Sequence, residues 1–330
     1  MPIIDMSDIQ EAVVIDDPTP AAETPEKRFI TANTTAITLQ SLKQDCTVPV
    51  FTRDNEVCIS HPDFIEAAQA AVSHFFSGER VEPAAIRVSH PIKGRRPEAI
   101  RKPADQLTPE DKTLYYQRMA FSIEIPTICE DINGNRLNLS LVGVKSYHLD
   151  NLNGRLAPQK FSFAVGFTNQ VCTNLCIFGD GYRNDVLAVD ASEIYRSVLS
   201  LLQLYDMSKH LNLMRSLTSE SLTESQFALL LGRMRLYNYM PVQLRRGLPK
   251  VEITDNALNA VARAYYTDPN FAVDSDGELD MWNFYNLLTG SITNSYIDLL
   301  LSREVNALDL SLGIAAGLRG EDAGYRWFLS

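Results

Sequence analysis

Cys172 and Cys176 are the residues whose type and spacing most directly indicate chemistry in this chain. Two thiolates at this spacing suit one pair of zinc ligands, but a structural zinc site needs four donors and no second close pair of Cys or His exists. Folding could bring His148 or His210 to them. Because free cysteine packs like a small apolar side chain, we expect structural thiols, no metal site and no cofactor.

A nucleophilic thiol is the alternative at the same segment. The thiol would need a nearby base, and His148 on the preceding predicted strand is the best candidate. Asn174 and Asp150 would then orient the base or stabilise an oxyanion. No spacing rule joins these groups, and no Gly-rich phosphate loop, nucleophile elbow or His-Glu zinc motif occurs, so the balance favours a protein that is not an enzyme.

Residues 87–102 form a basic segment in an acidic chain, and we take them as its one basic island. The chain has 41 Asp and Glu against 30 Lys and Arg, a formal net charge of −11, whereas this segment has a single acid, Glu98. Such a segment could neutralise phosphates while His90, or a nearby aromatic such as Tyr115 or Tyr116, stacks on a base. Alternatively, its charges pair with carboxylates elsewhere and hold a loop to the body. The candidate nucleic-acid-binding residues are Arg87, His90, Lys93, Arg95, Arg96, Arg101 and Lys102.

Length and composition indicate a folded protein of one large or two smaller units. The chain has 330 residues, 45% of them hydrophobic and 22% charged. The acidic balance argues against a surface that coats nucleic acid or anionic membrane throughout, and no run of about 18 apolar residues or secretory signal is present. We therefore expect a cytoplasmic protein with reduced thiols and no membrane partner.

Hydropathy patterns divide the chain into three parts. Residues 1–28, rich in Pro and acids, are expected to form a disordered acidic tail. Residues 29–185 carry alternating runs, such as Phe161–Phe167, that predict an antiparallel meander with one buried face. Residues 186–330 show helical periods, so we predict an α+β fold in which a helical unit packs on a strand-rich unit. The helical half could also form a homo-oligomer.

Turn and breaker residues place the strands of the predicted meander. Asn133-Gly134 predicts a tight turn between the first two strands, with Asn153-Gly154 after the second. Pro126 should end the first strand or lie on an edge, and Gly143 should mark a bulge. The segment 179–181 is most simply a turn, and residues 48–59 should form a strand or hairpin.

Capping residues predict where the helices begin. Ser60 should cap a helix that Gly78 ends, and the pairs Asp190 with Glu193 and Thr223 with Gln226 resemble capping boxes. Other helices are expected over residues 34–45, 109–116, 256–266, 281–288 and 295–301.

The segment that contains Val171, Cys172, Thr173 and Asn174 resembles a family of uncharacterised bacterial proteins, itself distantly similar to phage/plasmid-like proteins of mobile elements. The resemblance spans residues 30–310. The phage-type relatives have a Ser-His-Asp-Gly turn where this chain reads Ser-Tyr-His-Leu-Asp over residues 146–150, which puts a shared site at that turn in doubt. The resemblance implies a mobile-element setting and no reaction.

The leading hypothesis is therefore a non-enzymatic protein that binds DNA or RNA, or a nucleic-acid-handling partner, through the basic segment and an open face of the meander. An enzyme that uses Cys172 or His148, and a structural or interaction protein, are the alternatives.

Overall fold

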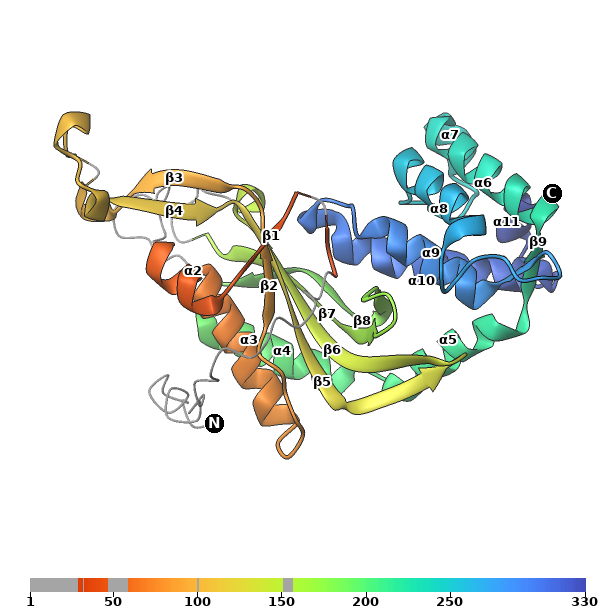
Figure 1. The fold of residues 1–330 in the computed structure, drawn as a ribbon, viewed down its shortest axis with the longest axis horizontal. Coiled ribbons are helices and arrows are strands. Elements are labelled where there is room, and N and C mark those ends of the chain that lie inside the picture. Colours follow the sequence, from red (N-terminus) through yellow and green to blue (C-terminus); the bar gives the residue numbers. More distant parts are fainter. Residues whose placement is uncertain (1–28, 32, 47–58, 100, 151–156) are drawn as a thin grey trace.

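The computed structural model describes residues 29–31, 33–46, 59–99, 101–150 and 157–330. Its centre is a six-stranded sheet of order β1-β2-β5-β6-β7-β8, in which all neighbouring strands are antiparallel (Figure 1). This confirms the α+β prediction, with the sheet in the first part of the chain and mostly helices after residue 190. The strands of this sheet are β1 (Thr35–Ile37), β2 (Ala85–Val88), β5 (Arg118–Ile132), β6 (Asn135–Ser146), β7 (Gln159–Asn169) and β8 (Leu175–Ala188).

The helices form around capping residues that are readable in the sequence. Ser60, Asp190 and Thr223 each accept a hydrogen bond from the backbone N–H three residues on, and this confirms the predicted helix starts. The helices are α2 (Leu39–Asp45), α3 (His61–Phe75), α4 (Ala191–Leu204), α5 (Met207–Ser216), α6 (Glu224–Tyr239), α7 (Val242–Arg245), α8 (Asp255–Thr267), α9 (Met281–Ile292), α10 (Ile297–Leu318) and α11 (Ala323–Arg326). Among the described residues, no helix combines the length and apolar character needed to cross a bilayer.

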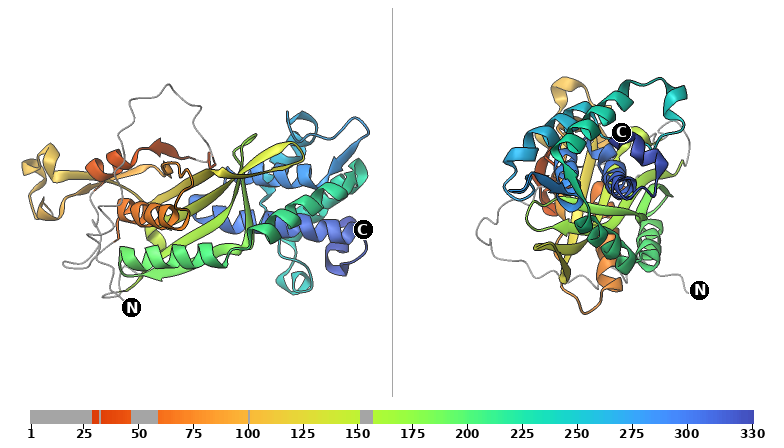
Figure 2. Two further views of the ribbon diagram at one scale, coloured as in Figure 1. Left: turned by 90° about the horizontal axis from the view of Figure 1, so that it is seen from below. Right: turned by 90° about the vertical axis from the view of Figure 1, so that its right-hand side faces the viewer.

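Both faces of the central sheet are covered, so the prediction of one open face is wrong. Every residue from Met119 to Ile125 of β5 is buried. Helices α3 and α4 lie side by side against one face, and α10 packs against the other (Figures 1 and 2). A strand buried on both faces keeps apolar side chains at successive positions, which alternation alone does not reveal.

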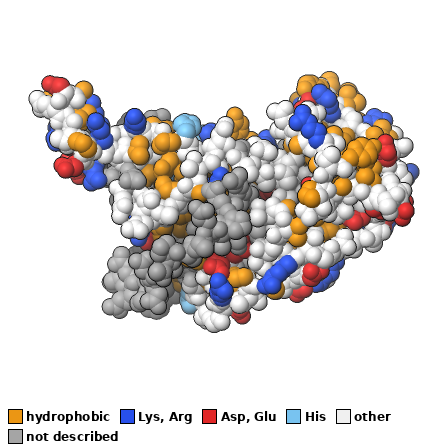
Figure 3. Space-filling model, in the orientation of Figure 1, with side chains coloured by type: hydrophobic (Ala, Val, Ile, Leu, Met, Phe, Trp, Pro, Cys, Tyr) orange, Lys and Arg blue, Asp and Glu red, His pale blue; other side chains and the backbone are white. Residues whose placement is uncertain are grey.

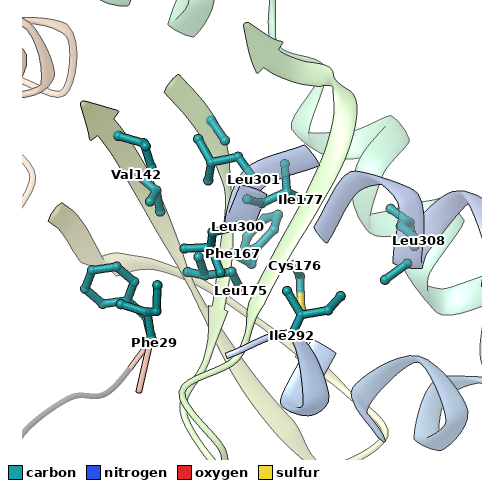
Figure 4. Packing of buried hydrophobic residues seen from close by; sticks show 14 of the residues in the cluster. Phe29, Val142, Phe167, Leu175, Cys176, Ile177, Ile292, Leu300, Leu301 and Leu308 are labelled. Atoms are coloured by element: carbon teal, nitrogen blue, oxygen red, sulfur yellow. The ribbon is translucent and has the colours of Figure 1, made fainter. Parts of the chain in front are cut away.

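Figure 4 shows the core between β8 and α10, where Leu300 lies near Ile177 and Leu308 lies farther along α10, apart from Cys176 and Ile177. Glu304 lies four residues from each of these two leucines, on the same side of α10, and is fully buried. Neither oxygen of its carboxyl group has a hydrogen-bond partner among the described residues.

Gly143 does not mark a bulge, because it pairs regularly with Phe121 on one side and Phe163 on the other. A Cβ atom at Gly143 would overlap the Phe121 ring and meet Phe64 of α3. The glycine thus makes room for an aromatic cluster under α3. The irregularity lies instead between Ile125 and Cys129, so the strand runs past Pro126 and does not end there.

The tight turn at Asn133-Gly134 is confirmed. Both residues have positive φ, 52° and 75°, as a two-residue hairpin turn requires, and Ile132 pairs with Asn135. Residues 179–181, in contrast, are not a turn but lie inside β8. The register shift between Ala164 and Gly166 of β7 accommodates them, and the carbonyl oxygen of Val165 lies against Gly181, where a Cβ atom has no room.

A second, two-stranded sheet consists of β3 (Pro91–Arg95) and β4 (Lys112–Tyr116) and extends away from the body (Figures 1 and 2). The predicted helix over 109–116 is wrong. Thr108 and Asp111 do form a capping box, but it opens only a 3₁₀ turn, Pro109–Asp111, before the chain becomes strand. Residues 34–45 are likewise divided between β1 and α2. The predictions for 1–28, 48–58 and Asn153-Gly154 lie outside the described residues.

The last short sheet joins the helices of the second half. β9 (Ser221–Thr223) pairs with β10 (Glu278–Asp280) and thereby sets the start of α6 beside the start of α9. Helices α6 and α8 pack against each other, with the rings of Phe227 and Tyr265 stacked at 4.2 Å between centroids. α8 in turn packs on α9.

Candidate nucleic-acid interface

We define the arm as residues 91–116, which contain β3, β4 and the connection between them. It carries six Lys or Arg and four Asp or Glu, in a chain whose overall formal charge is −11. Its inner face is anchored, because Thr113 and Tyr115 are buried and β4 lies beside α2. Basic side chains follow the arm in Figure 3, with acidic ones near its tip. The arm is therefore a local basic feature that projects from an acidic molecule.

Strand alternation gathers the cations of the arm on its outer face. Lys93 and Arg95 lie two residues apart on β3, and Arg95 pairs directly with Lys112 of β4. Lys93 and Lys112 are exposed, and Arg95 is half-buried. Three positive charges thus occupy one small area, and such an arrangement costs free energy unless an anion offsets it.

Lys112 was missed by sequence reasoning because residues 109–116 were interpreted as a helix. In a helix its neighbours would be residues three and four positions away, whereas in β4 its neighbour is Arg95, seventeen residues earlier. Half-buried Leu114 and Tyr116 lie on the same outer face. Of the three proposed stacking residues, Tyr115 faces inward and is buried, Tyr116 is half-buried on the outer face, and His90 is exposed at the base of the arm.

The remaining predicted residues on the arm have mixed environments. Lys102 pairs with Asp111 at 2.6 Å, and this ammonium group is the main cause that lowers the pKa of Asp111 to about 2. The Arg95 guanidinium donates a hydrogen bond to the Lys102 carbonyl oxygen at 2.7 Å. Arg96 and Arg101 are exposed, and within the described residues neither they nor Lys93 pair with a carboxylate.

Arg87 and His90 do not belong to the same surface. Arg87 lies on β2, is 6% exposed, and donates hydrogen bonds to the hydroxyl (3.2 Å) and carbonyl oxygen (2.9 Å) of Thr34. It fastens β1 to the sheet and is unavailable to a phosphate. His90 is exposed in the connection between β2 and β3, at the base of the arm.

The structure does not bring Cys172 and His148 together. Cys172 lies in the β7–β8 connection, next to the end of β6 at which Leu137 pairs with Asn169. His148 lies beyond Ser146 at the other end of β6, about 30 Å away at the rise of an extended strand. The His148 Nε2 atom lies 3.5 Å from a carboxylate oxygen of Asp298.

The other two candidate catalytic groups have structural contacts. Asp150 pairs with the fully buried ammonium group of Lys145 at 2.6 Å and accepts a hydrogen bond from the Lys160 N–H at 2.9 Å. Asn174 is buried and donates to the carbonyl oxygen of Asn286 at 3.0 Å and to the Thr289 hydroxyl at 3.1 Å. Each group therefore holds chain segments together.

Both thiols of the Cys-Thr-Asn-Leu-Cys segment are kept protonated. Burial raises the pKa of Cys172 to about 12 and that of Cys176 well above its ordinary value. A thiol becomes a nucleophile or a metal ligand only as the thiolate. In the described part of the chain, no group of three or more His, Cys, Asp or Glu side chains is placed to hold a metal ion.

Comparisons with known proteins place the chain in a family without assigning it a reaction. No curated protein and no solved structure matches it. A family described as "Domain of unknown function, B. Theta Gene description" matches residues 8–329. The match covers nearly the whole chain, sheet and helices together. The protein therefore belongs to this family, DUF3871, a domain of unknown function.

Proposed function

We propose that the protein binds nucleic acid through the outer face of the arm. The observation that carries this proposal is that Arg95 and Lys112 lie opposite each other on the paired strands β3 and β4, with Lys93 two residues from Arg95 on the same face. Phosphate groups spaced along a strand would offset these neighbouring charges, and Arg96 and Arg101 would extend the contact toward the tip. Tyr116 could add stacking on a base.

The acidic remainder of the molecule limits how this binding works. A net charge of −11 repels a polyanion from most of the surface, so contact would be confined to the arm. Such binding is expected to be weak at high salt, because the affinity comes from release of counterions by a few cations. The sheet itself takes no part, since both of its faces are covered.

The mobile-element setting is a further proposal, supported only by the resemblance of Val171, Cys172, Thr173 and Asn174 to phage/plasmid-like proteins. A protein of a mobile element that binds nucleic acid would be consistent with the arm.

The test is fluorescence anisotropy with labelled single-stranded DNA, duplex DNA and RNA at 50 and 200 mM salt. The triple variant Lys93→Ala, Arg95→Ala, Lys112→Ala should reduce the slope of log affinity against log salt by about 2 to 3, since three phosphate contacts are lost. The matched control, Arg80→Ala, Lys160→Ala, Lys209→Ala, removes the same charge from the body and should retain the slope. No binding at 50 mM salt, or equal loss in both variants, would end the proposal.

A further inference from the structure

Helices α6 and α7 present an apolar surface that nothing in the described structure covers. We call it the α6–α7 surface. Its large exposed side chains are Leu229, Leu236, Tyr239, Val242 and Leu244, with Tyr239 73% exposed. Hydrophobic and basic side chains lie together at this end of the molecule in Figure 3. Exposed apolar groups that gather in this way are typical of interaction sites.

The helical period of α6 shows that this exposure is systematic. The inward face carries Phe227, Leu230, Met234 and Tyr237, which are all buried at helical spacing. The opposite face carries Leu229, Gly232, Leu236 and Tyr239, which are exposed or half-buried. A helix that is apolar on both faces is normally buried on both. Gly232 has open space around it, so nothing within the described structure requires a glycine there.

The same surface is basic, a feature that the sequence reading missed. Residues 225–251 contain five Lys or Arg and no Asp or Glu, so they form a purer basic run than 87–102. Arg246 is exposed and makes no ion pair with any described residue. Arg235 lies 3.6 Å from Asp255 of α8, which also accepts a hydrogen bond from the Tyr239 hydroxyl at 2.6 Å, and Lys250 pairs with Glu252. A partner that offers apolar groups together with acidic groups for the unpaired Arg246 would match this surface.

Residues 1–17 of the same chain have this composition. They contain five Asp or Glu, no Lys or Arg, and eight Ile, Val or Met. The family match begins at residue 8 and so includes most of this segment. A docked nucleic acid, in contrast, would leave the exposed leucines without an apolar partner.

The first described residues put the segment within reach. Thr31 donates a backbone hydrogen bond to Thr293 at the end of α9 (2.8 Å). Packed helices lie about 8–10 Å apart, so α6 is about 20 Å from α9 across α8. Because α6 begins beside the start of α9, the 12 residues of α9 add about 18 Å along its axis, which gives a distance of about 27 Å. The eleven residues 18–28 can span up to about 35 Å when extended. Hence we propose that residues 1–17 dock on the α6–α7 surface through apolar contacts with its leucines and ion pairs with its arginines.

Hydroxyl-radical footprinting read by mass spectrometry tests this on the full chain. In the variant Asp5→Lys, Asp8→Lys, Glu11→Lys, oxidation of Tyr239 should rise at least twofold, because the docked segment is repelled. Tyr296 is 66% exposed and lies at the start of α10, so its oxidation should stay unchanged. The control variant Glu79→Lys, Glu98→Lys, Glu110→Lys makes the same charge change at exposed positions and should leave both tyrosines unaffected.

The surface side of the contact has its own test. In the double variant Arg235→Glu, Arg246→Glu, oxidation of Tyr239 should rise as much as it does in the variant with three lysines in residues 1–17. Unchanged oxidation of Tyr239 in both variants would overturn the proposal. So would a protected Tyr239 in a variant that light scattering shows to be a dimer, since a second copy would then be the occupant.

Discussion

Arg95 and Lys112 lie directly opposite each other in the β3–β4 pair, two like charges as cross-strand neighbours. Such a pair destabilises a sheet by a few tenths to about 1 kcal/mol relative to a neutral pair. The hydrogen bond from Arg95 to the Lys102 carbonyl oxygen does not neutralise this charge, so the pair is a reason to look for an anionic ligand. The predictions that follow separate this role from the alternatives.

Lys112→Glu should affect stability and binding in opposite directions. The new carboxylate would pair with Arg95 and stabilise the arm by up to about 1 kcal/mol, while removing a phosphate contact and adding repulsion. We expect a slightly higher melting temperature together with at least tenfold weaker oligonucleotide binding. Arg80→Glu makes the same charge change on the body and should alter neither property much. Unimpaired binding by Lys112→Glu would exclude the outer face of the arm.

Cys172 should be a poor nucleophile. Because burial raises its pKa to about 12, alkylation by iodoacetamide at pH 8 should modify Cys172 at least tenfold more slowly than exposed Cys129. Mass spectrometry of timed digests resolves the two sites. Modification of Cys172 at pH 6 as fast as that of Cys129 would revive the enzyme alternative.

Gly143→Ala should destabilise the fold by about 2–4 kcal/mol, because the added methyl group would collide with the Phe121 ring in a closely packed core. Gly179→Ala is the matched control within a strand, since its Cβ would meet only Val305, at 4.0 Å. Urea unfolding compares the two variants. Equal stabilities would mean that the cluster under α3 can rearrange freely.

Glu304 should make the protein less stable as pH rises. Burial raises its pKa well above 4.5, so the folded state keeps a proton that the unfolded state loses above that pH. The free energy of unfolding therefore falls by up to about 1.4 kcal/mol per pH unit. Glu304→Gln should remove this loss and be more stable than the unsubstituted chain by at least about 2 kcal/mol at pH 8, with a smaller gain at pH 5. Glu79→Gln, at an exposed position, should show no such gain at either pH.

Two buried histidines, His61 and His210, should make the protein less stable as pH falls. Burial is the main cause that lowers the pKa of His61 to about 4 and that of His210 to about 3. The unfolded state takes up protons near pH 6.5 while the folded state does not, so stability is lost as pH falls below 6.5. In the Glu304→Gln variant, which removes the opposing carboxyl contribution, the free energy of unfolding should be roughly 4 kcal/mol lower at pH 5 than at pH 7. A pH-independent stability in that variant would show that these imidazoles are protonated when folded.

The elements that the sequence predicts well are those set by neighbours a few residues apart. Ser60, Asp190 and Thr223 cap helices by accepting a hydrogen bond from the N–H three residues on. Asn133 and Gly134 adopt positive φ because these two residue types tolerate it better than others. These preferences act within a few residues of chain, so most helix starts followed from them.

Tertiary structure decided the rest, because the relevant neighbours are distant in sequence. Position 143 must be glycine because the rings of Phe121 and Phe64 leave no room for a Cβ atom there. The capping box at Thr108 opens only one 3₁₀ turn because the chain beyond it pairs with β3. The separation of His148 from Cys172 follows from the length of β6, which no local pattern shows.

The sequence by itself determined that this is an acidic chain with a few basic segments. Which cations share a surface was decided only by folding. Arg87 is buried beside Thr34 and is not part of the exposed basic surface. Lys112 lies next to Arg95 on that surface because β4 pairs with β3. Charge is counted along the sequence, but the potential that a ligand meets depends on distances in space, and the pairing of strands sets those distances.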